Sequence, residues 1–282
     1  MRILTRLWAK LPIKGSPFRS AISEEEVRST DDPFEGSGFD EQAGLHFKNV
    51  DGVYSNLLPA HKVFVAHERR LNLYKNGLDS RIRQLLWDYR IEETILRPGD
   101  VIVDVGANNG EFGIWATERG ARYFGFEPDP VAFAALKRNV STQQVFECAL
   151  SNTEEIQSFF LATSEADSSL FKPENATNEI KVKTLKFDTI ASTFIKEPFI
   201  RLLKVEAEGM EPEVLQGAAD SIHRVEYVAV DAGPERGGES TAVSVLNFLH
   251  ERNFEILDCF LFRGTFLLKN KNLVLQANGA KS

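Results

Sequence analysis

Apolar and polar positions along the chain form two recurring patterns, short apolar runs and longer segments with apolar residues at helical spacing. The apolar runs, each suited to a buried strand, are residues 101–105, 122–126, 144–150, 200–205 and 225–230. The segments with helical spacing are residues 79–96, 112–120, 129–140, 211–221 and 241–252. The first of these helices should turn three arginines to solvent, namely Arg81, Arg83 and Arg90. Strands that alternate with helices predict an α/β fold built on a mostly parallel sheet.

Further apolar runs complete this pattern. Residues 254–262 and 265–269 are joined so tightly at Arg263 and Gly264 that they must form an antiparallel hairpin. We therefore predict a mixed sheet that is covered by helices on both faces. A second strand-like pair, at residues 156–162 and 180–187, brackets a polar loop that is long enough for a lid or a substrate-binding loop, residues 163–178.

The N-terminal part of the chain has a different character. Residues 1–14 carry basic side chains on one side of a helical pattern and large apolar side chains on the other. Such a segment lies on an anionic membrane surface, or it docks on its own domain or on a second copy in a homo-oligomer. Residues 23–42 are acidic and aperiodic, which indicates a mobile linker. We predict an N-terminal extension and linker over 1–50, a cap segment with a helix over 51–97, and the main domain over 98–272.

Charge, cysteine count and hydropathy limit the function classes. The chain has 282 residues and a net charge of −8, which argues against nucleic acid as a partner. Cys148 and Cys259 lie in apolar runs, so we expect buried free thiols and neither a disulfide nor a metal site. The sequence has no apolar run long enough to span a membrane and no signal-peptide core at its start. These features predict a cytoplasmic protein, peripheral to a membrane if residues 1–14 bind one.

The stretch V-D-V-G-A-N-N-G at residues 103–110 joins a strand end, a tight glycine turn and a helix start. In α/β folds this unit holds a nucleotide-like cofactor. Its glycine spacing (106, 110 and 113) differs from the G-x-G-x-x-G of nicotinamide-binding turns. Asp104, before the turn, would repel a pyrophosphate but would suit the ammonium group of S-adenosylmethionine. Glu127 ends the next strand about twenty residues past the turn, where a ribose diol binds in such folds.

A structural alternative exists for each of these two carboxylates. Asp104 would then cap a helix, and Glu127 would lie in a surface turn. Each alternative is reasonable alone, but the two carboxylates at this spacing together favour S-adenosylmethionine over NAD.

Four stretches resemble the FkbM-type methyltransferases, class I S-adenosylmethionine-dependent enzymes that mostly methylate oxygens, often on sugars. They are P-G-D-V-I-V-D-V-G-A-N-N-G at 98–110, F-E-P at 126–128, A-L-S-N at 149–152 and L-L-K-V-E-A-E-G-M-E-P-E-V-L-Q-G-A at 202–218. The resemblance extends from about residue 53 to about residue 270, and the last stretch is the most specific. Glu206 is a departure, because the family usually has aspartate there and the longer carboxylate reaches farther.

The resemblance implies a Rossmann-like, three-layer fold with a seven-stranded sheet in the order 3-2-1-4-5-7-6. It also implies S-adenosylmethionine as the methyl donor and a small molecule or glycan as the acceptor, with a sugar hydroxyl as the methylated group. The positions that match the family's cofactor-binding set are Asp104, Gly106, Ala107, Asn108, Gly110 and Glu127, with Glu147 and Ala149 bordering the adenine.

Candidate catalytic residues follow from where the strands end. Ligands of open α/β sheets bind beyond the carboxyl ends of the strands, where Glu206, Glu208 and Asp231 lie. One of them would remove the acceptor's hydroxyl proton, or two would hold a divalent metal that acidifies it, although the site that we predict contains no metal. Lys204 shares a strand face with Glu206 and would orient the acceptor oxygen. Helix capping, or pairing with Lys204, is the non-catalytic alternative for the glutamates.

Two other function classes stay open. An NAD-dependent oxidoreductase on a similar fold is disfavoured by Asp104 and by the glycine spacing. A non-catalytic S-adenosylmethionine-binding subunit is disfavoured by the intact carboxylates after residues 200–205. Histidine is the usual base, but none is expected at the carboxyl end of a parallel strand among His46, His61, His67, His223 and His250.

Overall fold

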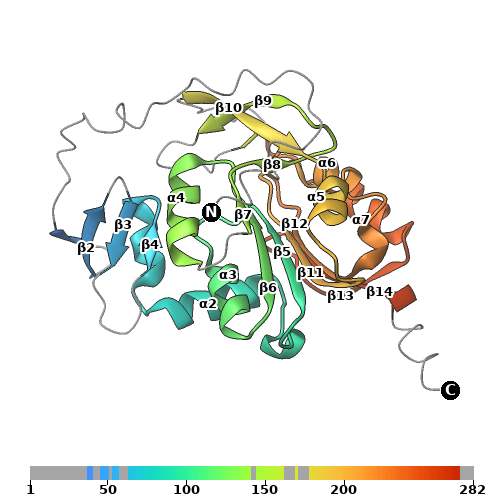
Figure 1. Cartoon of the computed structure of the whole chain (residues 1–282), viewed down its shortest axis with the longest axis horizontal. Helices are drawn as coiled ribbons and strands as arrows, with labels where there is room; N and C mark the ends of the chain where they lie inside the picture. Colours follow the sequence, from blue (N-terminus) through green and yellow to red (C-terminus); the bar gives the residue numbers. More distant parts are fainter. Residues whose placement is uncertain are drawn as a thin grey trace.

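A computed structural model describes residues 37–40, 45–50, 53–56, 63–140, 144–161, 169–170 and 178–273. Its centre is a seven-stranded sheet (Figure 1). In spatial order the strands are β13 (Phe254–Phe260), β14 (Thr265–Asn270), β12 (Val225–Asp231), β11 (Ile200–Val205), β5 (Val101–Val105), β6 (Arg122–Phe126) and β7 (Val145–Phe146). Only β14 runs antiparallel to its neighbours, β13 and β12. The predicted strand order, 3-2-1-4-5-7-6, and the antiparallel hairpin are confirmed.

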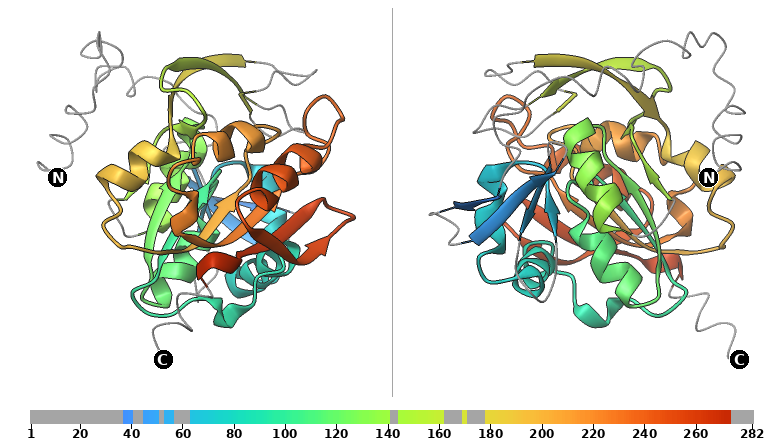
Figure 2. Two further views of the ribbon diagram at one scale, coloured as in Figure 1. Left: turned by 90° about the vertical axis from the view of Figure 1, so that its right-hand side faces the viewer. Right: turned by 60° about the vertical axis from the view of Figure 1, so that its left-hand side comes forward.

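Helices cover both faces of this sheet, as predicted (Figures 1 and 2). One face carries α2 (Leu78–Asp88), α3 (Glu111–Glu118) and α4 (Pro130–Asn139), and the other carries α5 (Phe187–Thr193), α6 (Glu211–Gln216) and α7 (Ala242–His250). Short 3-10 helices are η2 (Glu68–Tyr74), η3 (Glu93–Ile95) and η4 (Ile222–Arg224).

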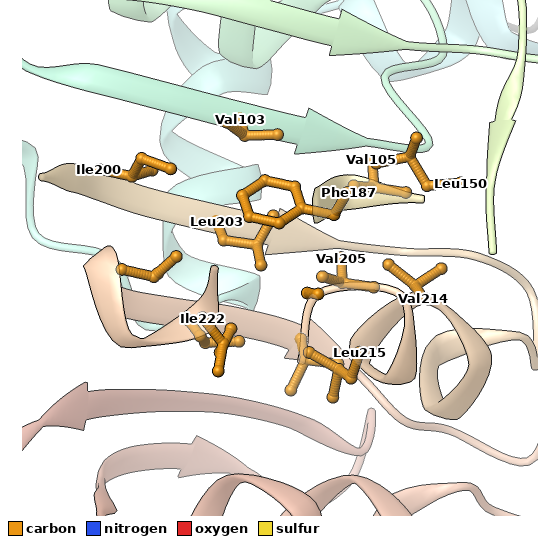
Figure 3. Close-up of a cluster of buried hydrophobic side chains, with 14 of the residues drawn as sticks. Val103, Val105, Leu150, Phe187, Ile200, Leu203, Val205, Val214, Leu215 and Ile222 are labelled. Atoms are coloured by element: carbon orange, nitrogen blue, oxygen red, sulfur yellow. The ribbon is translucent and has the colours of Figure 1, made fainter. Parts of the chain in front are cut away.

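The two faces of the sheet follow from alternation along each strand. On β5, Val103 and Val105 pack in the core beneath α5 and α6, and on β11 Val205 packs in the same core (Figure 3). Ile102 belongs to the core on the opposite face. Because Asp104 has the same parity as Ile102, its carboxylate is directed to the face covered by α2 and α3.

A smaller sheet lies beside the carboxyl edge of the main one. It consists of β8 (Ala149–Leu150), β10 (Asn178–Leu185) and β9 (Ile156–Leu161). The strand-like pair predicted on either side of the polar loop is confirmed as β9 and β10, which pair antiparallel. The strand predicted at residues 144–150 is in fact two short strands, since the chain bends at residues 147–148 and passes from the main sheet to the smaller one.

Paired strands lie on both sides of residue 50, where we predicted the end of the N-terminal extension and linker. A four-stranded antiparallel sheet contains β1 (Ser37–Asp40), β2 (Leu45–Val50), β3 (Val53–Asn56) and β4 (Phe64–Val65). The boundary would therefore fall between two paired strands, and the linker predicted at residues 23–42 contains β1. The amphipathic segment at residues 1–14 and most of the loop at residues 163–178 lie outside the described residues.

Helix α2 is shorter than the predicted helix at residues 79–96. It ends at Asp88, and Arg90 takes a left-handed backbone conformation with φ of 57°. The guanidinium of Arg90 stacks between the rings of Trp87 and Phe260, at 4.4 and 4.6 Å from the ring centres. These contacts stabilise the turn and attach the end of α2 to the β13–β14 hairpin.

Two composition-based expectations can be compared with the structure. Cys148 is a buried free thiol and Cys259 a half-buried one, so no disulfide joins them. Among the helices of the described residues, none has the length and apolar character required to cross a membrane.

Candidate active site

A cavity of about 310 Å³ lies at the carboxyl edge of the main sheet, where β5, β6 and β11 end and β8 begins. Eight of the predicted site residues line it, namely Gly106, Ala107, Asn108, Glu127, Ala149, Lys204, Glu206 and Glu208. The predicted residues that do not line it are Asp104, Gly110, Glu147 and Asp231. The sequence therefore located the cavity correctly but did not distinguish the residues on its surface from those behind it.

Gly106 opens the turn after β5, and its lack of a side chain is a structural requirement. Its φ is +73°, and a Cβ at this position would lie 1.9 Å from the backbone oxygen of Glu206. The backbone N–H groups of Gly106 and Ala107 both donate to the carbonyl of Phe126, at 3.0 Å. The turn is thus held tightly between the ends of β6 and β11.

Glu127 joins the turn to the end of β6. Its two carboxylate oxygens accept from the backbone N–H groups of Asn108 at 2.8 Å and Asp129 at 2.9 Å. Burial raises the pKa of Glu127 to about 7, although these hydrogen bonds oppose the shift. Asn108 has φ of 47°, and its buried side-chain oxygen has no hydrogen-bonding partner among the described residues. A buried acceptor without a partner is uncommon in folded proteins, and Asn108 as a residue lines the cavity.

Gly110 serves helix packing and does not face the cavity. A Cβ there would lie 2.7 Å from Leu136 and 2.9 Å from Val140, so glycine lets α3 approach the end of α4. Glu147 is exposed on the bend between β7 and β8, and partial burial raises its pKa. The prediction that both contact the cofactor therefore lacks geometric support, while Ala149 keeps its predicted position beside the cavity.

Asp104 lies behind the cavity in a closed ion pair. Its side chain is completely buried, and it contacts the Lys204 ammonium at 3.1 Å and the Tyr123 hydroxyl at 2.7 Å. Burial raises the pKa of Asp104, while Lys204 and Tyr123 lower it. The predicted ammonium-binding role is not what this geometry favours, because Lys204 already occupies the position of a cation.

Lys204 is a permanent cation that connects the strand ends. Its ammonium also contacts Glu206 at 3.2 Å and donates to the carbonyl of Gly106 at 2.7 Å. Burial alone would lower the pKa of Lys204, but the Asp104 and Glu206 carboxylates outweigh it and raise the pKa to about 12. A lysine with four acceptors around it stiffens the turn and has little capacity for another ligand.

Glu206 and Arg263 form the next part of this network. Burial would raise the pKa of Glu206, but Lys204 and Arg263 lower it to about 2. Arg263, from the β13–β14 turn, contacts Glu206 at 2.9 Å, Asp231 at 2.8 Å and Asp88 at 3.1 Å. Asp231 is thus held beneath Arg263, and burial raises its pKa. Sequence reasoning identified Arg263 only as a turn residue, yet it lines the cavity.

Two acidic residues near this network differ in their position. Glu208 lines the cavity with φ of 50°, and its backbone carbonyl accepts from the Ser169 hydroxyl at 2.8 Å. Glu235, which sequence reasoning missed, follows β12 and has a side-chain oxygen without a partner among the described residues. Burial, followed by the charges of nearby carboxylates, raises the pKa of Glu235 to about 9. Glu235 does not line the cavity.

The segment before β5 supplies a further part of the wall, through His67, Arg70 and Arg81. Asn109 fixes this segment to the turn, because its side-chain oxygen accepts from the Ala66 N–H at 2.9 Å. The prediction that Arg81 is solvated is wrong, since its side chain is only 14% exposed and pairs with Glu111. His67 reaches the cavity from an N-terminal segment, which a search restricted to strand ends could not reveal.

No group of three or more His, Cys, Asp or Glu side chains in the described part of the chain is arranged to hold a metal ion. The carboxylates of the site instead pair with Lys204 and Arg263.

The sheet order, the glycine turn between β5 and α3, and the cavity at the carboxyl edge define a class I methyltransferase fold. The sequence comparison agrees with this class, because the model of the methyltransferase FkbM domain matches residues 104–256. The chain belongs to the FkbM methyltransferase family.

Three relatives have described activities. The 31-O-demethyl-FK506 methyltransferase FkbM of Streptomyces tacrolimicus is 36% identical over 96 residues, which cover 32% of this chain and 37% of the relative. The 2-O-methyltransferase NoeI of Sinorhizobium fredii is 23% identical over 75% of this chain and 96% of the relative. The hexuronic acid methyltransferase AglP of Haloferax volcanii is 28% identical over 54% of this chain and 64% of the relative. The chain thus spans little more than a third of the first of these relatives.

Proposed function

We propose that this protein transfers a methyl group from S-adenosylmethionine to an oxygen atom, a hydroxyl group of a sugar or glycan. The observation that carries the donor half of this proposal is the position of Glu127 and Asn108 in the cavity. Glu127 places a carboxylate at the end of β6, and Asn108 beside it donates its backbone N–H to that carboxylate and lines the cavity. This carboxylate fits the ribose hydroxyls of an adenosine cofactor, with Ala149 and Leu150 on the side where an adenine would lie.

Glu111 supports S-adenosylmethionine over a dinucleotide. It is the first residue of α3, where a dinucleotide's pyrophosphate would bind, and its carboxylate lines the cavity. Asp104 does not serve this discrimination, because its charge is compensated by Lys204. We assign the donor and acceptor sites to a methyltransferase domain over residues 98–272, with residues before it completing the cavity wall.

The acceptor half rests on the relatives. Two of the three names specify an O-linked methyl group, and the third specifies a hexuronic acid. These names describe those proteins, but a shared acceptor class agrees with a cavity whose lining contains many charged side chains, which suit a polar acceptor. Contact with a membrane through residues 1–14 and assembly into a homo-oligomer stay predictions.

S-adenosylmethionine would supply an activated methyl group on its sulfonium. The chain must then position the acceptor oxygen and receive its proton. Glu206, with a pKa of about 2, keeps its charge near neutral pH, so it suits orientation of the hydroxyl. Lys204, with a pKa of about 12, stays charged and holds the Glu206 carboxylate in place. Glu208 lines the cavity and is the predicted carboxylate that we assign to accepting the proton.

The first experiment is a binding test by thermal unfolding with S-adenosylmethionine, S-adenosylhomocysteine and NAD. We expect stabilisation by the first two ligands and none by NAD. Stabilisation by NAD alone would instead identify an oxidoreductase. The second experiment follows transfer of a labelled methyl group to a panel of sugars and uronic acids. Cofactor binding with no transfer to any acceptor would favour a non-catalytic subunit.

A further inference from the structure

Arg81 and Glu111 form an ion pair in the wall of the cavity. Arg81 lies on α2 and Glu111 begins α3, and the Arg81 Nε lies 3.4 Å from the Glu111 Oε1. The same Oε1 accepts from the Tyr74 hydroxyl at 2.6 Å. Their side chains are 14% and 6% exposed, and both residues line the cavity. The pair is therefore held in place by the fold and faces the space where a ligand would bind.

Both members of this pair have unused hydrogen-bonding capacity. Within the described part of the chain, the two Nη groups of Arg81 and the Oε2 of Glu111 have no hydrogen-bonding partner. The pair formed by Asp104 and Lys204 differs, because its ammonium is surrounded by acceptors and its carboxylate is completely buried. Of these two pairs, only the Arg81–Glu111 pair can bind another charged molecule without losing its own contacts.

We propose that Arg81 and Glu111 bind the α-amino-acid end of the methyl donor. The Nη groups of Arg81 would donate to the α-carboxylate, and the Oε2 of Glu111 would accept from the α-ammonium. This assignment rests on the proposed function. It is argued from charge complementarity, because a zwitterion presents one charge of each sign and the pair offers one of each. It also gives the ammonium a partner other than Asp104, which lies behind the cavity.

The assignment can be tested with two ligands that differ only in the amino-acid part. S-adenosylhomocysteine contains it, whereas methylthioadenosine has the same nucleoside and thioether without it. In Arg81→Met, measured by titration calorimetry, we expect the affinity for S-adenosylhomocysteine to fall by about 10- to 100-fold. The affinity for methylthioadenosine should change less than about twofold, since no charged group is lost from its contacts. Arg83→Met is the matched control, because Arg83 is an exposed arginine on the same helix.

Glu111→Gln provides a second variant, which keeps an oxygen that can accept from Tyr74. It should weaken S-adenosylhomocysteine selectively as well, through loss of the carboxylate's charge. Retained methylthioadenosine affinity shows that either variant has kept its folded cavity. Equal losses for both ligands, or no loss for either, in Arg81→Met would overturn the assignment. Failure of the unmodified protein to bind either ligand would overturn the proposed function itself and the assignment with it.

Discussion

Lys204→Met should destabilise the protein far more than an average core substitution. Methionine has nearly the length of lysine, so the change removes the charge and leaves most of the volume. It leaves Asp104, with a completely buried side chain, without its cation, and it removes the donor to the Gly106 carbonyl. Breaking a buried ion pair by removing one partner costs about 3–5 kcal/mol. With a typical domain stability of about 5–15 kcal/mol, this is a large share of the total.

Urea unfolding at pH 7, followed by tryptophan fluorescence, measures this loss. For an m value of about 3 kcal/mol/M, the midpoint should fall by about 1–1.7 M. Adding Asp104→Asn to Lys204→Met should recover much of the loss, since the unpaired buried charge is then gone. A single-variant loss below about 1 kcal/mol, or a double variant no more stable than the single one, would show that the unpaired Asp104 charge carries no such cost.

The same variant should also respond differently to pH. Burial already raises the pKa of Asp104, and removal of Lys204 should raise it further. As pH falls from neutral through the raised pKa of Asp104, the folded carboxylate takes up a proton while the unfolded aspartate, with a pKa of about 3.9, stays ionised. Since the folded state binds more protons, the stability of Lys204→Met relative to the unmodified protein should rise over this interval.

Further predictions concern the turn, Glu206 and the hairpin arginine. Gly106→Ala should lower the free energy of unfolding by about 4 kcal/mol or prevent folding, because the new Cβ would collide with the Glu206 backbone oxygen. Gly99→Ala is the control, since Gly99 also has a positive φ, +86°, but has open space around it. It should lower the free energy by only about 1–2 kcal/mol, measured by thermal unfolding. The pKa of Glu206 is lowered to about 2 in the folded protein, so its contribution to stability is present above pH 4.5 and is lost as pH falls towards 2. The stability of Glu206→Gln, measured over the same pH range, should not show this loss. Arg263→Lys should lower the free energy of unfolding by about 1–3 kcal/mol, measured with urea, because an ammonium cannot contact three carboxylates as the planar guanidinium does. Unchanged stability would contradict this role.

The fold could be predicted from the sequence because its signals are local. The apolar run of β5 and the glycine turn after it specify strand and helix without reference to distant residues. The hairpin between β13 and β14 is similarly local, since Arg263 and Gly264 leave no room for a crossover. The split of residues 144–150 could not be predicted, because both halves are apolar and only their pairing with β6 or β10 separates them.

The site was predicted in part, for a related reason. The rule that ligands bind at strand ends places Glu206 and Glu127 beside the cavity, where the structure has them. It does not show which acidic side chain is already paired with a cation of the protein. Asp104 has a buried cation opposite it because Lys204 is its register partner on β11. This pairing can be inferred once the strand order is known, because both residues stand one position before their strands' last valine.

Arg263 carried a usable signal that was missed. Asp231 pairs with Thr265 across β12 and β14, so a charged residue two positions before Thr265 must lie just beyond Asp231. The sequence contains no such signal for Arg81, because arginines at helical spacing look the same whether that face of the helix meets solvent or a neighbouring helix. Only the packing of α2 against α3 places it beside Glu111.

These positions imply a division of roles within the cavity. The charges on the main sheet, from Lys204, Glu206 and Asp231, are largely compensated by one another and by Arg263, so they fix the geometry of the strand ends. Unused hydrogen-bonding capacity lies instead on Asn108, Arg81 and Glu111, in the turn and the helices around it. A methyl donor would therefore bind mainly to the turn and helices over a rigid, charge-compensated sheet.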